Sequence, residues 1–146
     1  MALPNQAVRV HDARARDCFN VVIGLQRESA APSHVREAVD DLKRSVTRLT
    51  GGVTLSLSEG TWAAKANQNN FSGPIEDNVA INLLITLLPS DAPTVWPRIE
   101  AEIRHVVRAH QLSCEAVHVM AWRAQSHIFS ISGTDLFSPL NPETAA

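Results

Sequence analysis

The stretch Leu49-Thr50-Gly51-Gly52-Val53-Thr54, followed by Gly60-Thr61-Trp62, divides the chain near its middle. Before this stretch, a run with a two-residue hydrophobic period leads into a run with a helical period. After it come two more strand-like runs, a second helical run and a last strand-like run. This order of periodicities, βαββαβ, predicts a fold more firmly than it predicts an activity.

The first half of the chain holds one expected strand and one expected helix. Residues 18–26 alternate between apolar and other side chains, which predicts a strand with one apolar face. Ser33 is expected to cap a helix, whose apolar stripe follows at spacings of three and four: Val35, Val39, Leu42, Val46 and Leu49. Gly51 and Gly52 are expected to end this helix, because glycine accepts the left-handed conformation of a helix C-terminus.

The second half holds three expected strands and one expected helix. Residues 53–58 predict a strand with one polar face, and residues 78–88 are apolar on both faces, which is typical of a central strand. Residues 94–111 have the pattern of an amphipathic helix. Residues 114–122 predict a last strand, and residues 127–132 a short extra one. Between the strands expected at residues 53–58 and 78–88, residues 63–74 carry several asparagines, Gly73 and Pro74. They are expected to form a long loop.

Composition and charge exclude several classes of protein. The chain has 146 residues, of which 45% are hydrophobic, and a formal net charge of -2. One packed domain is therefore expected, and a nucleic-acid or membrane-surface partner is not. Residues 1–17 are expected to form a flexible arm, residues 18–132 the domain, and residues 133–146 a loosely docked or disordered tail. Without a signal peptide or an apolar span, the expected location is cytoplasmic.

Two amphipathic helices and four strands in this order predict an α+β two-layer sandwich of the ferredoxin-like kind. Its four-stranded antiparallel sheet would have the order fourth, first, third, second, with both helices on one face. In that sheet Cys18 and Cys114 lie near opposite ends, about 20 Å apart, which is too far for a disulfide. The helices are expected to cover the face that carries Phe19, Val21, Val53, Leu55, Ile81, Leu83, Val117 and Val119.

The opposite face of the sheet is where a function is expected. It would display Asn20, Val22, Gly24, Thr54, Ser56, Ser58, Ala80, Asn82, Leu84, Thr86, His118, Met120 and Trp122. Because about half of these side chains are apolar, the face suits an interface or a ligand site better than bare solvent. Three coverings fit: a second copy of the chain, a ligand under the asparagine-rich loop, or the chain's own tail. A homodimer packed sheet to sheet is the first choice.

The glycine stretch also resembles a pattern in known proteins. Gly51-Gly52 with Thr54, then Gly60-Thr61-Trp62, is similar to the GG-x-T…G-x-W pattern of a group of small uncharacterised bacterial and phage proteins with a ferredoxin-like core. The resemblance covers residues 19–122 and implies this fold, without catalytic residues to transfer. Its bacterial and phage setting suggests a role in mobile elements or host–phage conflict. The asparagine-rich insertion departs from the pattern.

Two hypotheses about function remain. The first is a non-enzymatic binding protein, dimeric through the open face, that holds a small polar ligand or a protein partner. Its expected ligand-binding residues are Asn20, Ser56, Asn82, His118, Trp122, Asn67, Asn69 and Asn70, whose amides and hydroxyls donate and accept without formal charge. The alternative is a cofactor-independent enzyme of the dimeric α+β barrel type, a monooxygenase or isomerase, with His118 as general base.

The sequence carries no other recognisable site. His105 and His110 are five residues apart, not the four that align two metal ligands on one helix face, so no metal is expected. No cofactor motif and no nucleophile elbow are present, so no cofactor or catalytic nucleophile is predicted.

Overall fold

A computed structural model describes residues 14–63, 73–114, 116–127 and 131 of the chain. In order along the chain, its elements are β1 (Arg14–Gln26), the 3-10 turn η1 (Arg27–Ser29), α2 (Pro32–Thr50), β2 (Thr54–Trp62), β3 (Glu76–Leu87), α3 (Ala92–Ala109) and β4 (Val117–Ser126). The predicted βαββαβ order is confirmed.

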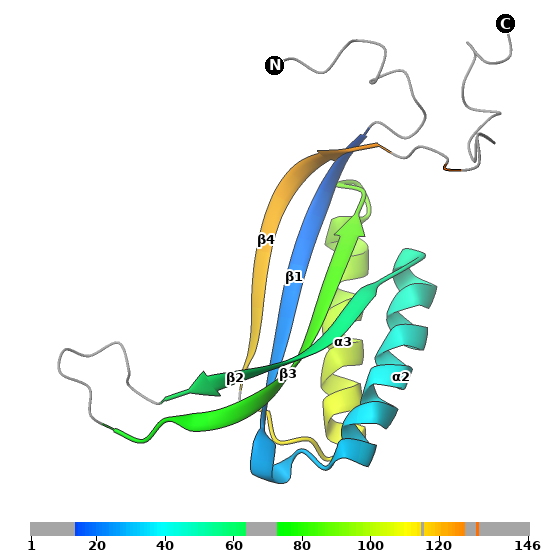
Figure 1. The fold of residues 1–146 in the computed structure, drawn as a ribbon. Coiled ribbons are helices and arrows are strands. Elements are labelled where there is room, and N and C mark those ends of the chain that lie inside the picture. Colours follow the sequence, from blue (N-terminus) through cyan, green and yellow to red (C-terminus); the bar gives the residue numbers. More distant parts are fainter. Residues whose placement is uncertain (1–13, 64–72, 115, 128–130, 132–146) are drawn as a thin grey trace, which may run out of the picture.

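The four strands form one antiparallel sheet of order β2-β3-β1-β4, as predicted. The strands β1 and β3 lie in the centre, and Val21 of β1 is paired with Leu83 on one side and Val119 on the other. Both helices lie on the same face of the sheet, side by side (Figure 1). The chain is therefore a ferredoxin-like α+β sandwich with one covered and one open sheet face.

The hydrophobic core fills the layer between the helices and the sheet. Val21, Ile23, Leu83 and Ile85 from the central strands are fully buried there. The helices contribute the apolar stripes that their periodicities predicted, Val35, Leu42 and Val46 from α2 and Ile99, Ile103 and Val106 from α3. Because each helix has a single apolar stripe, it can pack on one sheet face only, which leaves the other face without helices.

One aromatic contact joins α3 to the sheet. The rings of Phe19 on β1 and Trp96 on α3 are stacked, with centroids 4.3 Å apart and planes 8° from parallel. This geometry places a large planar apolar contact at the N-terminal half of α3.

Several strands are longer than expected. β1 begins at Arg14 instead of Cys18, because its ladder with β4 continues to the pair Arg14–Ser126. A cross-strand ion pair strengthens this end: the Arg123 guanidinium donates to both carboxylate oxygens of Asp17, at 2.8 and 3.4 Å. Residues 14–17 of the expected arm thus belong to the sheet, and the tail and residues 128–130 lie outside the described residues.

β2 is also longer than its alternation predicted. The Gly60-Thr61-Trp62 stretch, which the sequence suggested as a break, continues the strand, and Trp62 is paired with Glu76 of β3. Glycine suits this position because a neighbouring side chain approaches its backbone closely: a Cβ here would lie 2.9 Å from Asn78 Oδ1.

The ends of α2 follow the expected pattern at one terminus only. Gly51 is the C-cap, with a left-handed φ of 85°, and its N–H donates to the Thr47 carbonyl at 2.8 Å. At the N-terminus, the prediction that Ser33 caps the helix is wrong. Ala31 occupies the N-cap, because Pro32 already has the φ of a first helical residue and needs no hydrogen-bonded N–H.

The helices cover the sheet less completely than expected. Val117 and Val119 of β4 were expected beneath them, but these side chains are 37% and 44% exposed. β4 is an edge strand, and a groove lined by both valines separates it from α3, so the prediction of burial is wrong for this edge.

The two cysteines are not in a disulfide, as the topology predicted. Cys18 is paired with Trp122 in the second half of β4, whereas Cys114 precedes the start of that strand at Val117. The two thiols therefore belong to different ends of the sheet.

Candidate functional site

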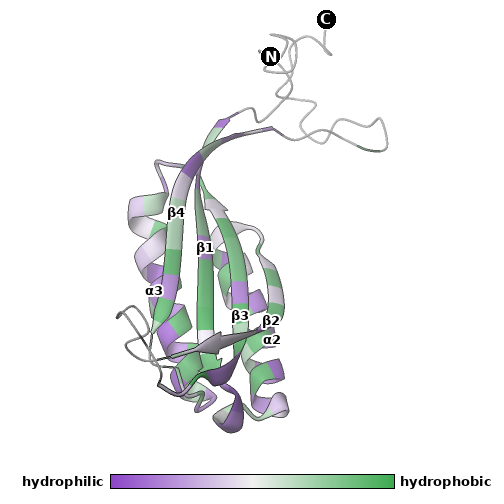
Figure 2. Cartoon of the chain, turned by 60° about the vertical axis from the view of Figure 1, so that its left-hand side comes forward, coloured by the Kyte–Doolittle hydropathy of each residue, from purple (hydrophilic) through white to green (hydrophobic). Residues whose placement is uncertain are grey.

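The open face of the sheet is the candidate site, and the strand register sets which side chains are neighbours on it. One row crosses all four strands from Thr54 through Leu84 and Asn20 to Met120. The next row runs from Ser56 through Asn82 and Val22 to His118. Figure 2 shows the sheet from this side, with the helices behind it and apolar bands along β1 and β3.

The sequence-predicted residues are only partly brought together. Ser56, Asn82 and His118 share one row, while Asn20 lies in the next row between Leu84 and Met120. Trp122 lies one row further along, opposite Cys18. Asn67, Asn69 and Asn70 lie outside the described residues.

The Asn82 side chain already has partners within the sheet. Its amide nitrogen donates to the Ser58 hydroxyl at 2.8 Å and approaches the Ser56 carbonyl at 3.5 Å. Asn82 therefore stabilises the pairing of β2 with β3, and only its carbonyl oxygen remains for a ligand.

A small hollow of about 140 Å³ lies at one end of the open face. We call it the Gly24 hollow, and it is lined by Val22, Gly24, Leu25, Gln26, Trp62, Glu76, Asp77, Asn78, Ser113, Ala116 and His118. It exists in part because Gly24 has no side chain, and a Cβ built there would meet only the Asn78 amide nitrogen, at 3.7 Å. Of the predicted ligand-binding residues, His118 lines the hollow.

The hollow contains functional candidates that the sequence reasoning missed. Trp62, Glu76 and Asp77 reach it because β2 and β3 continue beyond the ends that their alternation predicted. The Gly60-Thr61-Trp62 stretch was a usable signal, since an aromatic residue two positions after a strand glycine faces the same side as that glycine.

Asn78 gives the hollow an unusual polar group. Its Oδ1 atom is shielded from solvent, and no hydrogen-bond donor reaches it among the described residues. A Cβ at Gly60 would lie 2.9 Å from this oxygen, so Gly60 leaves room for the amide. The Asn78 side chain thus has its amide nitrogen on the Gly24 side, where the hollow lies, and its Oδ1 atom on the Gly60 side.

Around the hollow, the open face exposes large apolar side chains. Leu84 is 43% exposed, Met120 59% and Trp122 46%. They come from β3 and β4, on either side of β1, with the polar Asn20 between Leu84 and Met120. Such a patch is typical of an interface.

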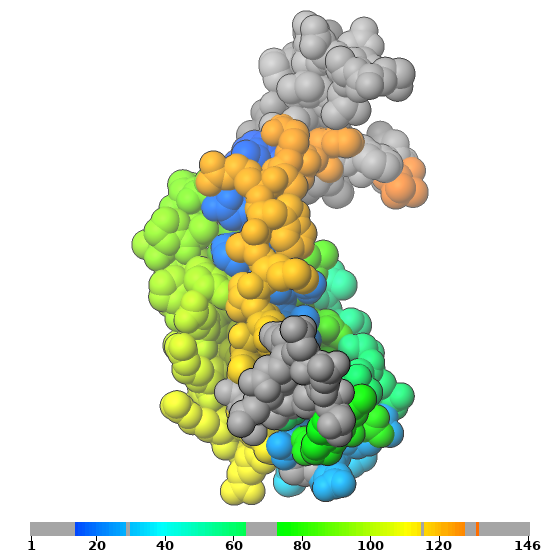
Figure 3. Space-filling model, turned by 90° about the vertical axis from the view of Figure 1, so that its left-hand side faces the viewer, coloured from blue at the N-terminus to red at the C-terminus, as the bar shows by residue number. Residues whose placement is uncertain are grey.

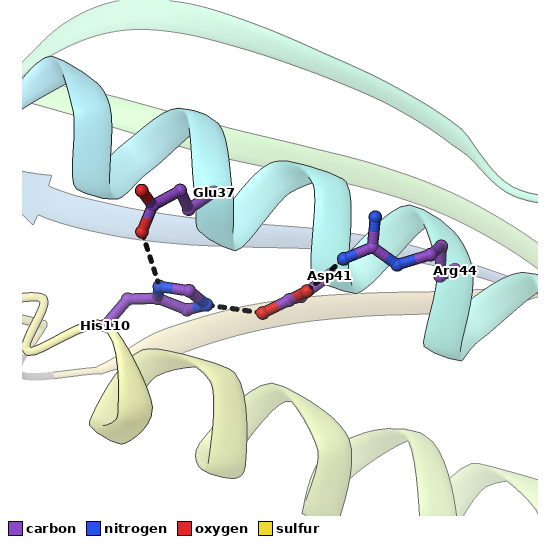
Figure 4. Close-up of polar contacts among 4 residues, drawn as sticks. All are labelled: Glu37, Asp41, Arg44 and His110. Atoms are coloured by element: carbon purple, nitrogen blue, oxygen red, sulfur yellow. Dashed lines mark hydrogen bonds and ion pairs between the residues drawn. The ribbon is translucent and has the colours of Figure 1, made fainter.

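A second polar cluster joins the two helices on the other side of the molecule (Figure 4). The His110 Nε2–H donates to Asp41 Oδ2 at 2.5 Å, and His110 Nδ1 lies 3.7 Å from Glu37 Oε2. The hydrogen bond from His110, with a further contribution from Arg44, holds the pKa of Asp41 below its ordinary value. His110, the C-cap of α3, thus links α3 to α2.

Neither cluster has the composition of a metal centre. Within residues 14–63, 73–114, 116–127 and 131, no three His, Cys, Asp or Glu side chains gather so that they could hold an ion. In the described part of the chain, no helix combines the length and apolar composition needed to cross a membrane.

Comparison with known proteins finds solved structures that resemble the chain in fold only. No protein-family model and no curated protein matches the chain. A phage SAM lyase in complex with S-methyl-5'-thioadenosine superposes with a TM-score of 0.48 at 10% identity, over 83% of this chain and 96% of that one. The periplasmic divalent cation tolerance protein CutA from Archaeoglobus fulgidus gives a TM-score of 0.38 at 15% identity, over 88% and 99%. The GlnK–ATP complex of B. subtilis gives 0.38 at 14%, over 73% and 82%. At these identities and scores the likenesses carry no function to this chain.

Proposed function

We propose that this protein is a small binding protein that self-associates through the open face of its sheet and holds a small polar ligand in the Gly24 hollow. The observation that carries the proposal is the exposure of Leu84, Met120 and Trp122 on a face that neither helix covers. A second copy of the chain would bury these side chains and cover the hollow at the same time.

The open face has the dimensions of an interface. The β1–β4 ladder is ten pairs long. With strands about 4.8 Å apart and about 3.3 Å per residue, four strands of this length present about 600 Å² in projection. Stable interfaces bury about 800 Å² of accessible surface per partner. The accessible surface of the open face is larger than its projected area because side chains protrude from it, so the face is large enough for such an interface.

The lining of the hollow favours a ligand that donates hydrogen bonds. Glu76 and Asp77 provide carboxylates, and Trp62 provides a flat aromatic wall. Carboxylates accept hydrogen bonds, and an aromatic face attracts planar or positively charged groups. A compact ligand with N–H donors therefore fits this lining better than an anion.

Self-association is tested by light scattering after size-exclusion chromatography, with wild type and Met120→Glu. We expect the wild type to be a dimer and the variant a monomer, because burying an unpaired carboxylate in the interface is costly. Gln125→Glu is the matched control, since it adds the same charge to β4 on its other face and should leave the dimer intact. A monomeric wild type at tens of micromolar would refute the proposed interface.

Ligand binding is tested by native mass spectrometry of protein purified gently from its expression host. An extra mass on the wild type should persist in Gly24→Ala, whose Cβ has only an ordinary contact, and disappear in Gly24→Val, whose methyl groups fill the hollow. An extra mass that persists in Gly24→Val places the ligand elsewhere. If neither the wild type nor the variants carry an extra mass, the ligand is removed from the proposal.

One observation favours a second candidate, an enzyme with His118 as general base. His118 lines the hollow, so its imidazole is next to the volume that a substrate would occupy. Asn20, the residue expected to polarise a carbonyl, lines no part of the hollow and lies in another row. Once a ligand is identified, turnover that is lost in His118→Ala while binding persists would favour the enzyme over the binding protein.

A further inference from the structure

A groove of about 620 Å³ lies between α3 and β4, on the helix side of the sheet and away from the open face. We call it the α3–β4 groove. Its walls are Trp96, Glu100, Ile103, Arg104, Val107, Arg108, Gln111 and Leu112 on the helix side, and Cys114, Ala116, Val117 and Val119 on the strand side. Figure 3 shows β4 in orange beside α3 in yellow-green on this side of the molecule.

The floor of the groove is apolar and open to solvent. Val117 and Val119 point to the helix side of the sheet, yet 37% and 44% of their surfaces remain exposed. Trp96 and Val107 on α3 are only half-buried. These side chains would release water if an apolar molecule covered them, at about 25 cal/mol for each Å² removed from water.

The charges of the groove differ between its two ends. Near the Trp96 end, Glu100 pairs with Arg104 at 3.6 Å, so an acidic and a basic group neutralise one another. At the Gln111 end, Arg108 forms no ion pair with any residue that the structure describes. The amide of Gln111 supplies further donors beside it. An anionic group is thus favoured at the Gln111 end over the other end, where the paired charges cancel.

The groove is long and narrow. Trp96 and Arg108 are twelve residues apart on α3, which corresponds to about 18 Å at 1.5 Å per residue. Divided over this length, the volume gives a mean cross-section of about 35 Å², so the groove suits an elongated ligand. The total volume is within the range of small-molecule sites, about 300–1,000 Å³.

We infer that the α3–β4 groove binds an unbranched aliphatic carboxylate of the fatty-acid class. The carboxylate lies at Arg108 and Gln111, and the chain runs over Val117 and Val119 toward Trp96. This site is on the opposite side of the sheet from the proposed dimer face, so it does not depend on the proposed function.

The test is isothermal titration of the full chain with sodium dodecanoate below its micellar concentration. We expect a single site, and dodecanol, which has the same chain without the charge, should bind at least several-fold more weakly. Arg108→Gln should weaken dodecanoate binding about five- to ten-fold, because it removes a charge-assisted hydrogen bond at a partly exposed position. The control Arg98→Gln removes the same charge from α3 outside the groove and should leave the affinity unchanged. No binding, or equal losses in both variants, would overturn the inference.

The position of the chain is tested by a second pair of variants. Val119→Glu places a carboxylate on the groove floor and should abolish binding, whereas Gln125→Glu places one on the same side of β4 beyond the groove and should not. Circular dichroism of both variants confirms that they fold. Binding that survives Val119→Glu would place the ligand elsewhere and contradict the site.

Cys114 provides an independent readout, because it lines the groove while Cys18 is buried outside it. Dodecanoate should slow the alkylation of Cys114 by iodoacetamide, and Cys18 should stay unreactive as the internal reference for folding. Protection of Cys114 that rises with protein concentration in the absence of dodecanoate would assign the groove to a second copy of the chain. Protection that is lost on removing residues 132–146 would assign it to the chain's own tail. Either result would overturn the inference.

Discussion

Alanine substitutions at the two adjacent glycines that follow α2 should change stability in opposite directions. Gly51 is the C-cap of the helix, with φ 85° and ψ -11°. Gly52 is outside the left-handed region, since Gly51 is the one glycine with positive φ among the described residues. A Cβ at either position would meet nothing within 4 Å, so neither substitution causes a steric clash.

The magnitudes follow from the backbone alone. A non-glycine residue in the left-handed conformation costs about 1–2 kcal/mol, so Gly51→Ala should lower the free energy of unfolding by about 1 kcal/mol. Gly52→Ala restricts the unfolded chain without straining the folded one, which should raise the free energy of unfolding by about 0.4–1 kcal/mol. The two variants should therefore differ by about 1.5–2 kcal/mol.

Urea unfolding followed by circular dichroism measures this difference, at one protein concentration so that self-association contributes equally. In thermal unfolding, each kcal/mol should appear as a shift of about 2–4 °C for a domain of this size. The reasoning is refuted if Gly52→Ala destabilises the protein as much as Gly51→Ala. It is also refuted if Gly51→Ala is neutral while the urea m-value is unchanged, since the left-handed cap would then carry no cost.

Two further predictions concern the contacts of α3. The folded-state pKa of Asp41 is held below its ordinary value of 3.8, mainly by the hydrogen bond from His110. This carboxylate therefore stabilises the fold above about pH 4, and its contribution is lost as the pH falls through the lowered pKa. Urea midpoints measured from pH 2 to pH 6 should therefore fall less steeply in Asp41→Asn than in wild type, and parallel profiles would contradict the assignment. In a double-mutant cycle with Phe19→Leu and Trp96→Leu, the stacked rings should show a coupling of about 1 kcal/mol, and additive single losses would mean that the stacking contributes nothing beyond burial.

The element order and the strand order were both predictable from the sequence, because both depend on local periodicity and on short connections. The alternation in β1 and the four-three spacing in α2 each bury one face, and few arrangements bury all of these faces together. Gly51 was likewise predictable as a helix end, because its conformation is a local property of the backbone.

The element ends and the candidate site were less predictable, because they depend on partners distant in the sequence. Trp62 belongs to the hollow because β2 keeps its ladder with β3 past Gly60, and nothing in the local alternation indicates that pairing. His110 meets Asp41 across 69 residues of chain, so a search for metal-ligand spacing within one helix could not find the contact.

The sequence by itself determined which residues form strands and helices and which face of each is apolar, since these are properties of neighbouring residues. The tertiary structure alone decided how completely the faces are covered. Val117 and Val119 carry the same apolar pattern as Val21, yet they remain exposed because their strand is at the edge of the sheet, where a groove separates it from α3. Periodicity predicts which way a side chain points, but what lies opposite that side chain depends on the width and packing of the whole molecule.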